Sequence, residues 1–222
     1  AFDPTYAPLR SLWRKAQEQD QRPSPEEIRG CLQKTGIENL KIRDGKVSFT
    51  KPGMQIDLGG IAKGYAIDEA VKLLTKKGAT AGLVNVGGDI RVFGGGSGVP
   101  VWKIKVHDPR KEKHSPIFIS LKNAAVVTSG DYARYFRIGK RRYSHIINPQ
   151  TGRPADEVSS VTVIGPRALF CDGLATAMSV MNPEKARELT GSLADIECMI
   201  MTKKHGENGK ISQSFGFKRY LD

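Results

Sequence analysis

The segment Asp57 to Asp68 has the composition of an anion-binding helix start: Asp-Leu-Gly-Gly-Ile-Ala-Lys-Gly-Tyr-Ala-Ile-Asp. Gly59 and Gly60 would let the backbone approach a ligand closely, and a helix start offers N–H groups that have no partner within the helix. Lys63 adds a full positive charge one turn inside the expected helix. An ordinary glycine-rich turn between a strand and a helix also explains the glycines, so this segment alone leaves both interpretations open.

Asp172 and Thr176 stand four residues apart at the expected start of another helix, in the run Asp-Gly-Leu-Ala-Thr. Residues with this spacing lie on one face of a helix. A carboxylate and a hydroxyl on one face suit Mg²⁺, which takes few protein oxygens and fills its other positions with water or phosphate. The simpler alternative is that Asp172 caps the N-terminus of its own helix.

Residues 128–154 are unusually polar, and His145 is the residue of greatest chemical interest among them. It stands between an aromatic strand and a turn rich in Asn, Pro and Gly, where a side chain could reach a ligand as a general base. A histidine in a strand more often has a structural role, and that alternative stays open.

The run Asn85-Val86-Gly87-Gly88-Asp89 ends one expected strand and begins the next. A plain hairpin turn explains the two glycines. It does not explain the polar residues on either side of them, which indicate a turn that faces a ligand.

The elements that must position these residues are more often strands than helices. The hydrophobic pattern predicts a β-hairpin over 40–50 around Asp44-Gly45, and it predicts helices around 9–16, 24–32, 67–74, 174–181 and 183–189. Further strands are expected at 82–86, 89–93, 101–106, 117–121, 124–127, 142–147, 158–164 and 196–201. Residues 94–98 are expected to form a flexible loop. The pattern is that of an α+β fold.

Composition limits the partners only weakly. The 222 residues are 39% hydrophobic and 26% charged, as in an ordinary globular protein, and we expect one domain over residues 1–222. The formal charge of +12 suits a phosphate-bearing small molecule, an anionic membrane surface or nucleic acid. The basic residues are scattered and lack an RNA-stacking motif, so we expect no nucleic-acid partner. The three cysteines have no metal-ligand spacing and are expected to be buried hydrophobes.

Taken in order, these segments resemble the ApbE-type flavin transferases, also called FAD:protein FMN transferases. The resemblance is collinear over nearly the whole chain. It runs through residues 1–5, 57–68, 85–89, 128–136, 143–154 and 172–177. It implies mostly antiparallel sheets with helices packed on them, in an ApbE-like architecture related to the T-fold.

The resemblance also implies roles for individual residues. FAD would be contacted by Asp57, Lys63 and the segment His145-Ile146-Ile147, with Asn85, Asp89 and Ser129 added to the same site. Mg²⁺ would be held by the Gly60 carbonyl, the Asp172 carboxylate and the Thr176 hydroxyl. His145 would be the catalytic base.

Two features depart from the family pattern. Many members carry Asp where this chain has Asn148, which removes a negative charge near the presumed base. The family domain also has a further stretch before the Phe-Asp-Pro-Thr block, so the domain is expected to be incomplete at its N-terminus. Two explanations are open: a naturally short member, or a fragment whose remainder another chain supplies.

The function implied by the resemblance is magnesium-dependent transfer of FMN from FAD to a Ser or Thr hydroxyl of an acceptor flavoprotein, with release of AMP. Two alternatives remain, a magnesium-dependent FAD pyrophosphatase that yields FMN and AMP, and a non-catalytic FAD-binding protein. By analogy with relatives, the expected location is periplasmic or membrane-anchored, close to a membrane, with a cytoplasmic location also open.

Overall fold

The computed structural model describes residues 1–94, 101–106, 108, 116–131, 134–203 and 209–222. The chain forms two compact units, one made of residues 1–60 and 131–156 and the other of residues 61–130 and 157–222. The expectation of a single family domain over residues 1–222 stays a prediction. None of the helices in the described part of the chain has the length and apolar character needed to cross a bilayer.

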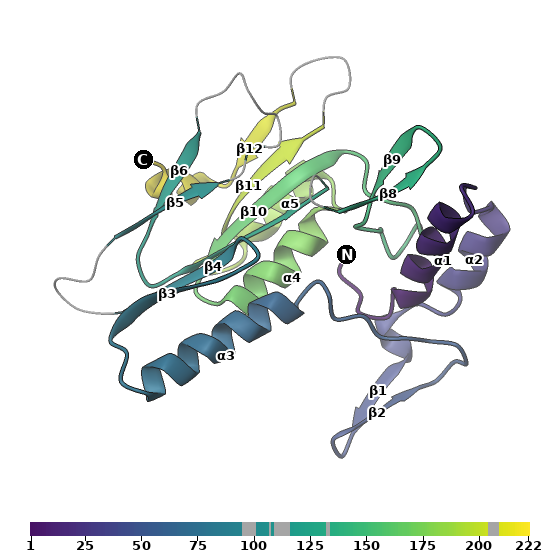
Figure 1. The fold of residues 1–222 in the computed structure, drawn as a ribbon, viewed down its shortest axis with the longest axis horizontal. Helices are drawn as coiled ribbons and strands as arrows, with labels where there is room; N and C mark the ends of the chain where they lie inside the picture. Colours follow the sequence, from purple (N-terminus) through teal and green to yellow (C-terminus); the bar gives the residue numbers. More distant parts are fainter. Residues whose placement is uncertain (95–100, 107, 109–115, 132–133, 204–208) are drawn as a thin grey trace. The chain divides into compact units, whose positions relative to one another are not determined.

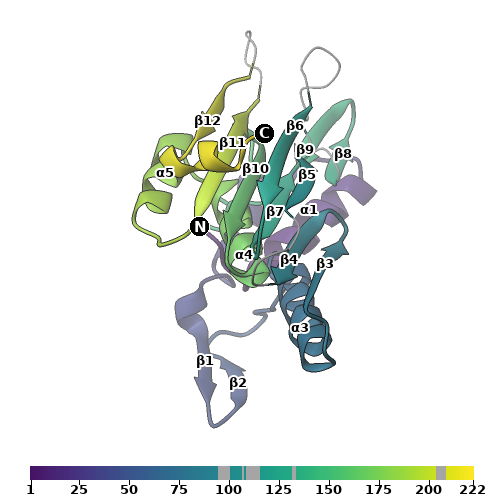
Figure 2. The ribbon, with the colours of Figure 1, turned by 90° about the vertical axis from the view of Figure 1, so that its left-hand side faces the viewer.

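The unit of residues 61–130 and 157–222 is built on a six-stranded sheet. Its strands are β3 (Ala81–Val86), β4 (Asp89–Gly94), β7 (Ala125–Gly130), β10 (Val158–Gly165), β11 (Glu197–Thr202) and β12 (Ile211–Gln213). They follow the order β12-β11-β10-β7-β4-β3 with antiparallel pairing throughout, as Figure 2 shows from left to right. The expected mostly antiparallel α+β fold is confirmed.

Each face of this sheet is covered by different elements. One face packs against α3 (Ala62–Lys76), α4 (Ala168–Met178) and α5 (Pro183–Gly191), and the other packs against β5 (Trp102–Val106), β6 (Ile117–Leu121) and the 3-10 helix η2 (Phe215–Tyr220). Side chains alternate between the faces, so that Val163 of β10 lies with the helices and Ile164 lies with β5, β6 and η2. Figure 1 shows α3 and α4 side by side.

The unit of residues 1–60 and 131–156 has a smaller core around Trp13. Its elements are α1 (Ala7–Glu18), α2 (Pro25–Leu32), the 3-10 helix η1 (Ile37–Asn39), β1 (Leu40–Arg43), β2 (Lys46–Phe49), β8 (Tyr135–Ile138) and β9 (Arg141–Ser144). The Trp13 ring lies 6.5 Å from that of Phe136 and 5.3 Å from that of Tyr143, measured between centroids. Its indole N–H donates to the Gly152 carbonyl at 2.8 Å. The tryptophan therefore ties α1 to the β8–β9 hairpin.

Most predicted elements are present, with three differences. The strand expected at 142–147 ends at Ser144, so His145 lies beyond the strand and not in it. Its partner β8 and the short β12 were not predicted. The helix expected at 174–181 begins earlier, at Ala168, which puts Asp172 in its second turn. In the expected loop at 94–98, residues 95–98 lie outside the described part of the chain.

Close contact between α3 and α4 depends on Gly64. A Cβ atom at this position would lie 2.4 Å from the Ala168 carbonyl oxygen and 2.7 Å from the Leu169 Cα. Both are main-chain atoms of α4, which cannot rotate out of the way as the end of a flexible side chain can. The absence of a side chain at Gly64 therefore sets how closely the two helices approach.

Gly64→Ala is expected to lower the free energy of unfolding by about 3 kcal/mol, because the methyl group forces the helices apart, even though alanine favours a helix. Gly191→Ala in α5 is the matched control, because its Cβ would meet nothing within 4 Å. The control is expected to be neutral or stabilising by up to about 1 kcal/mol. Urea unfolding of both variants measures the difference, and equal stabilities would contradict the packing role of Gly64.

Candidate functional site

Asp172 caps a helix that is not its own. The N-cap residue of α3, Ile61, supplies no side-chain hydrogen bond, and Asp172 Oδ2 accepts the Gly64 N–H of its first turn at 3.0 Å. The simpler sequence alternative, in which Asp172 caps its own helix, is therefore wrong, because α4 begins four residues before Asp172. The carboxylate is instead fixed at the positive end of the neighbouring helix.

Asp68 of α3 does the same for α4. The N-cap residue Arg167 provides no side-chain cap, and the Asp68 carboxylate accepts the N–H groups of Ala168 and Leu169 at 3.0 and 3.1 Å. Asp68 also forms an ion pair with Arg91 of β4 and lies 3.5 Å from the Arg167 Nε. The two helices thus exchange capping carboxylates, which fixes the rotation of α4 and the position of Asp172 on it.

The Asp172 carboxyl group is almost completely buried, with 1% of its surface exposed. Burial raises its pKa to about 6, because the charged form loses its hydration. The Gly64 N–H and the Lys63 charge oppose the increase in pKa, whereas Asp89 adds to it. A carboxylate that is costly to ionise in this environment would gain from a bound cation.

Thr176 lies one helical turn after Asp172, on the same face of α4. Its hydroxyl is 3.5 Å from the Ser129 hydroxyl of β7. The structure thus brings together two residues that the sequence assigned separately, one to metal binding and one to FAD binding. On this face of α4 the Asp172 carboxylate is followed by the Thr176 hydroxyl, and the Ser129 hydroxyl of β7 lies beside the latter.

Lys63 is held by Asp89 through an ion pair between Nζ and Oδ2. Asp89 is 1% exposed, and its other oxygen accepts the Thr128 N–H at 3.2 Å. Burial raises the Asp89 pKa, and the hydrogen bond and charge of Lys63 partly offset this. With so little exposed surface, Asp89 is better placed to orient Lys63 than to contact a ligand itself.

Asn85 of β3 stands two residues before a two-residue hairpin turn, Gly87-Gly88. Gly87 and Gly88 have φ angles of +62° and +97°, the conformation that a tight turn of this kind requires. The Asn85 Oδ1 atom accepts the Gly88 N–H at 2.9 Å. The polar residue therefore closes the turn, and the predicted contact of Asn85 with a ligand stays a prediction.

Asp57 lies in the unit of residues 1–60 and 131–156, where it organises the residues before Gly60. Its Oδ1 atom accepts the Gly59 N–H at 2.7 Å, and its Oδ2 atom forms an ion pair with Arg10. The Asp57 N–H donates to the Pro4 carbonyl at 2.7 Å. The side chain therefore fixes the backbone at Gly59.

His145 follows β9 directly, and its Nδ1 atom lies 2.9 Å from the Arg134 carbonyl oxygen. A carbonyl oxygen can only accept, so this geometry assigns the proton to Nδ1 and leaves the Nε2 lone pair available. Burial lowers the His145 pKa, and the charges of Arg134 and Arg10 lower it further, whereas the hydrogen bond and Asp131 raise it. The imidazole is thus neutral at pH 7, as a general base requires.

The residues after His145 form a turn, and Ile147 packs in the Trp13 core. Ile146 and Ile147 are buried, 8% and 4% exposed. The Asn148 Oδ1 atom accepts the N–H groups of Gln150 and Thr151 at 2.9 and 3.3 Å. Asn148 therefore performs a turn-forming role that does not require a negative charge.

The donor atoms present are chemically suited to magnesium. Asp172 supplies a buried carboxylate and Thr176 a hydroxyl, and Gly60 is one residue before the N-cap of α3, the helix whose first turn Asp172 contacts. These are hard oxygen donors, which Mg²⁺ prefers. Within the described ranges no group of three or more His, Cys, Asp and Glu gathers as a metal site. The predicted set would in any case contain a single carboxylate.

Sequence reasoning assigned no role to Arg10, Asp68 or Arg91. The structure shows that Arg10 pairs with Asp57, and that Asp68 and Arg91 pair with each other beside the start of α4. The sequence did contain one signal for a role of Asp68, because this residue ends the glycine-rich segment and stands five residues after Lys63. No local pattern could indicate its partners, which are 23 and 100 residues away in sequence.

The fold is of the α+β class with a mostly antiparallel sheet, and comparison with known proteins gives the family. The ApbE family matches residues 1–200, and the chain belongs to this family. It is 34% identical to the FAD:protein FMN transferase of Escherichia coli K12 over 100% of its own length and 65% of that protein. The Vibrio cholerae protein of the same name is 37% identical over 100% of the chain and 67% of its own length.

Solved structures agree with this assignment. The ApbE protein of Thermotoga maritima superposes with a TM-score of 0.87 and 38% identity, over 100% of this chain and 72% of that one. The ApbE-like fold is therefore confirmed. The chain spans 65% of the length of the E. coli relative, so the activity of the whole relatives comes to it only as a proposal.

The raised pKa of Asp172 makes stability depend on pH. The Asp172 carboxyl keeps its proton up to about pH 6 in the folded state, whereas the ordinary pKa of this group is 3.8, so stability is lost as pH rises between these values. In chelator-containing buffer, Asp172→Asn is expected to be more stable than the parent at pH 7 by up to about 3 kcal/mol, with the difference vanishing below about pH 4.

Urea unfolding at several pH values measures this difference. Asp195→Asn is a control in the same unit, because Asp195 is exposed and has a φ of +59°, which asparagine tolerates. A stability difference for Asp172→Asn that stays constant from pH 4 to pH 7 would show that the buried carboxyl does not titrate as described.

Proposed function

We propose that the chain catalyses magnesium-dependent transfer of FMN from FAD to a Ser or Thr hydroxyl of an acceptor flavoprotein, releasing AMP. Its family membership and the FAD:protein FMN transferase activity for which its relatives are named support this proposal. The observation that carries it within the chain is the buried Asp172 carboxylate, fixed against the first turn of α3 next to Lys63. This arrangement suits a diphosphate with a bound divalent cation.

The proposed reaction is a substitution at phosphorus. The acceptor hydroxyl oxygen forms a bond to the flavin-side phosphorus of FAD, and the bond from that phosphorus to the bridging oxygen breaks. AMP leaves with the bridging oxygen, and the acceptor is left with FMN joined through a phosphodiester. The hydroxyl proton passes to His145 Nε2, and from there to solvent.

Lys63 would neutralise charge on the diphosphate, with Asp89 holding its ammonium group in place. Asp172, Thr176 and the Gly60 carbonyl would hold Mg²⁺, which supplies electrostatic stabilisation of the phosphate oxygens. Ser129 would add a hydroxyl donor beside Thr176. These groups bind and orient the phosphates, which is the main protein contribution to phosphoryl transfer.

The remaining FAD-binding residues act in different ways in this proposal. Ile146 and Ile147 would provide main-chain groups, since their side chains are buried. Asp57 and Asn85 would act through the turns that they close, at Gly59 and Gly88. We assign His145 to the reaction from the family resemblance together with its available Nε2 lone pair.

The chain itself, incubated with FAD, MgCl₂ and an acceptor flavoprotein domain, is expected to make the acceptor fluorescent on a denaturing gel and to release one AMP per flavin attached. Chromatography of the small molecules identifies the alternatives. Free FMN with AMP and no labelled acceptor would identify a pyrophosphatase, and FAD bound without AMP would identify a binding protein. Either result would overturn the proposed transfer.

Two substitutions separate the proposed base from the proposed metal ligand. His145→Ala is expected to keep FAD affinity and to lower the transfer rate about 10²-fold to 10⁴-fold, the usual effect of losing a general base. Asp172→Ala is expected to be more severe and to lose Mg²⁺ affinity in calorimetry. Because the His145 pKa is lowered, transfer by the parent should decline only below its ordinary value of 6.5.

Full transfer by His145→Ala would remove this residue from the mechanism. Unchanged Mg²⁺ affinity in Asp172→Ala would remove Asp172 from the metal site. The two outcomes are independent, because one concerns the acceptor proton and the other concerns binding of the cation.

A further inference from the structure

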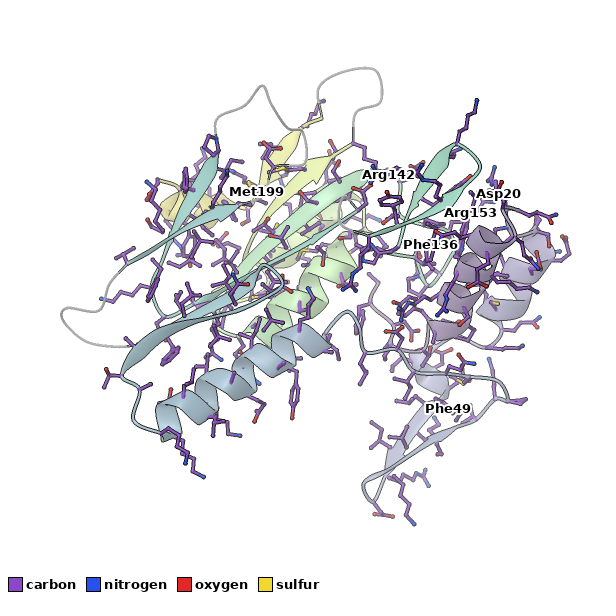
Figure 3. All side chains as sticks on the ribbon, viewed as in Figure 1. Asp20, Phe49, Phe136, Arg142, Arg153 and Met199 are labelled. Atoms are coloured by element: carbon purple, nitrogen blue, oxygen red, sulfur yellow. The ribbon has the colours of Figure 1, made fainter. Side chains whose placement is uncertain are left out.

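The β8–β9 hairpin has one buried face and one charged face. Its strands pair Phe136 with Tyr143 and Ile138 with Arg141, and three of these four residues pack in the Trp13 core. Side chains alternate along a strand, so the neighbouring pairs project from the opposite face. That outer face carries Tyr135, Arg137 and Arg142. Arg142 of β9 is labelled in Figure 3.

Tyr135 serves as a platform for both arginines of this outer face. The Arg142 guanidinium carbon lies 3.8 Å from the centre of the Tyr135 ring, and that of Arg137 lies 5.8 Å from it. The ring is 37% exposed, and both arginines are exposed. Stacking on the ring leaves the planar edge of the Arg142 guanidinium free to form paired hydrogen bonds with a carboxylate, whereas the Arg137 side chain is also hydrogen-bonded to Tyr135.

This surface is strongly cationic. Lys140 lies in the turn of the hairpin, and Arg141 is the first residue of β9. Together with Arg137 and Arg142, four basic residues therefore occupy positions 137–142. Within the described part of the chain, the ion pair that these four basic residues form joins the Arg141 guanidinium to the Asp156 carboxylate, at 3.8 Å. Exposed pairs at such a distance contribute little, so the surface keeps most of its positive charge.

The hairpin is held firmly in its own unit. The main-chain N–H of Arg137 donates to the Gln17 side chain at 2.7 Å, and that of Gly139 donates to Asp20 at the end of α1. Trp13 packs against the inner face. The charged surface is therefore preorganised, which lowers the entropy cost of binding a partner.

The open end of the hairpin leads directly to His145. Arg134 immediately precedes β8 and His145 immediately follows β9, and the hydrogen bond between them joins the two strand ends. A strand of four residues spans roughly 13 Å. A peptide lying along the outer face with its hydroxyl at His145 would thus have neighbouring side chains within reach of Arg142 and Arg137.

We propose that the outer face of the β8–β9 hairpin, formed by Tyr135, Arg137 and Arg142, binds an acidic segment of the acceptor protein beside the hydroxyl that receives FMN. This inference rests on the proposed transfer, because a protein acceptor must be recognised near the catalytic base. Arginine is the better carboxylate binder, and three of the four basic residues are arginine. Charge complementarity thus selects Asp and Glu near the acceptor hydroxyl.

The test is the double variant Arg137→Glu/Arg142→Glu, assayed for flavin transfer at about 0.05 M salt. The KM for the acceptor is expected to rise about tenfold or more, with kcat at saturating acceptor within about twofold of the parent. The effect should shrink at about 0.5 M salt, where exposed charges are screened. In the acceptor, replacing Asp and Glu near the hydroxyl by Asn and Gln should raise the acceptor KM measured with the parent enzyme. The same replacements should leave the acceptor KM of the double variant unchanged.

The matched control is Arg43→Glu/Lys46→Glu in the β1–β2 hairpin. These cations also face each other across a hairpin, in the same unit, and the change in net charge is identical. The control should leave the acceptor KM at the parent value. Tyr135→Phe, which keeps the ring, should have an acceptor KM closer to that of the parent than Tyr135→Ala, which removes the ring on which Arg142 stacks.

The outcomes distinguish this inference from the proposed function. If the parent transfers no flavin, the proposed function fails. If the parent transfers flavin but the double variant and the control have equal acceptor KM values, the docking surface is wrong. The double variant could instead lose binding to vesicles containing anionic phospholipid while its acceptor KM stays at the parent value. That result would also overturn the proposed docking surface and would assign the surface to membrane binding.

Discussion

The exchange of capping carboxylates between α3 and α4 is the interaction on which the candidate site depends. Two helix N-termini that lie close together each carry a partial positive charge and unpaired N–H groups. Asp68 and Asp172 supply the anions that stabilise this arrangement, each from the second turn of one helix to the first turn of the other. Gly64 allows the necessary approach. The position of Asp172 is thus set by helix packing.

The same arrangement explains why Asp172, and not its neighbours, suits a cation. Three carboxylates are buried here, Asp68, Asp89 and Asp172. Asp68 is paired with Arg91 and Asp89 with Lys63, whereas Asp172 accepts a hydrogen bond from the Gly64 N–H. A buried charge that lacks a full counter-charge is costly, and this cost appears in the raised pKa. A divalent ion would supply the missing charge.

Local sequence predicted the elements well wherever one face is buried and the other is solvated. Helix α1 follows this rule, with Leu9, Trp13 and Ala16 of its apolar stripe buried. The strands of the β1–β2 hairpin are exposed apart from Leu40, and this hairpin was predicted from its Asp44-Gly45 turn. The β8 strand was missed because its exposed face carries Tyr135 and Arg137, which weakens the alternation of apolar and polar residues.

Contacts between distant residues were the harder part. A single helix cannot reveal that Asp172 caps α3, because its partner Gly64 lies 108 positions away. The family resemblance suggested Lys63 and Asp172 as members of one site, and the structure brings them close enough for the Lys63 charge to lower the Asp172 pKa. The roles of the predicted ligand residues toward FAD stay predictions.

The environment of His145 determines what kind of base it can be. In many sites a carboxylate accepts the second imidazole N–H and raises the basicity of the ring, whereas here the acceptor is the neutral Arg134 carbonyl. Burial and the charges of Arg134 and Arg10 lower the His145 pKa, and the hydrogen bond to the carbonyl only partly opposes this. Such a base is weak, yet at pH 7 it is in the neutral form that can accept the hydroxyl proton, with the Nε2 lone pair available. For the proposed transfer, orientation of the acceptor hydroxyl toward Nε2 therefore matters more than proton affinity, and Asn148 can serve as a turn residue without the charge that an aspartate would bring.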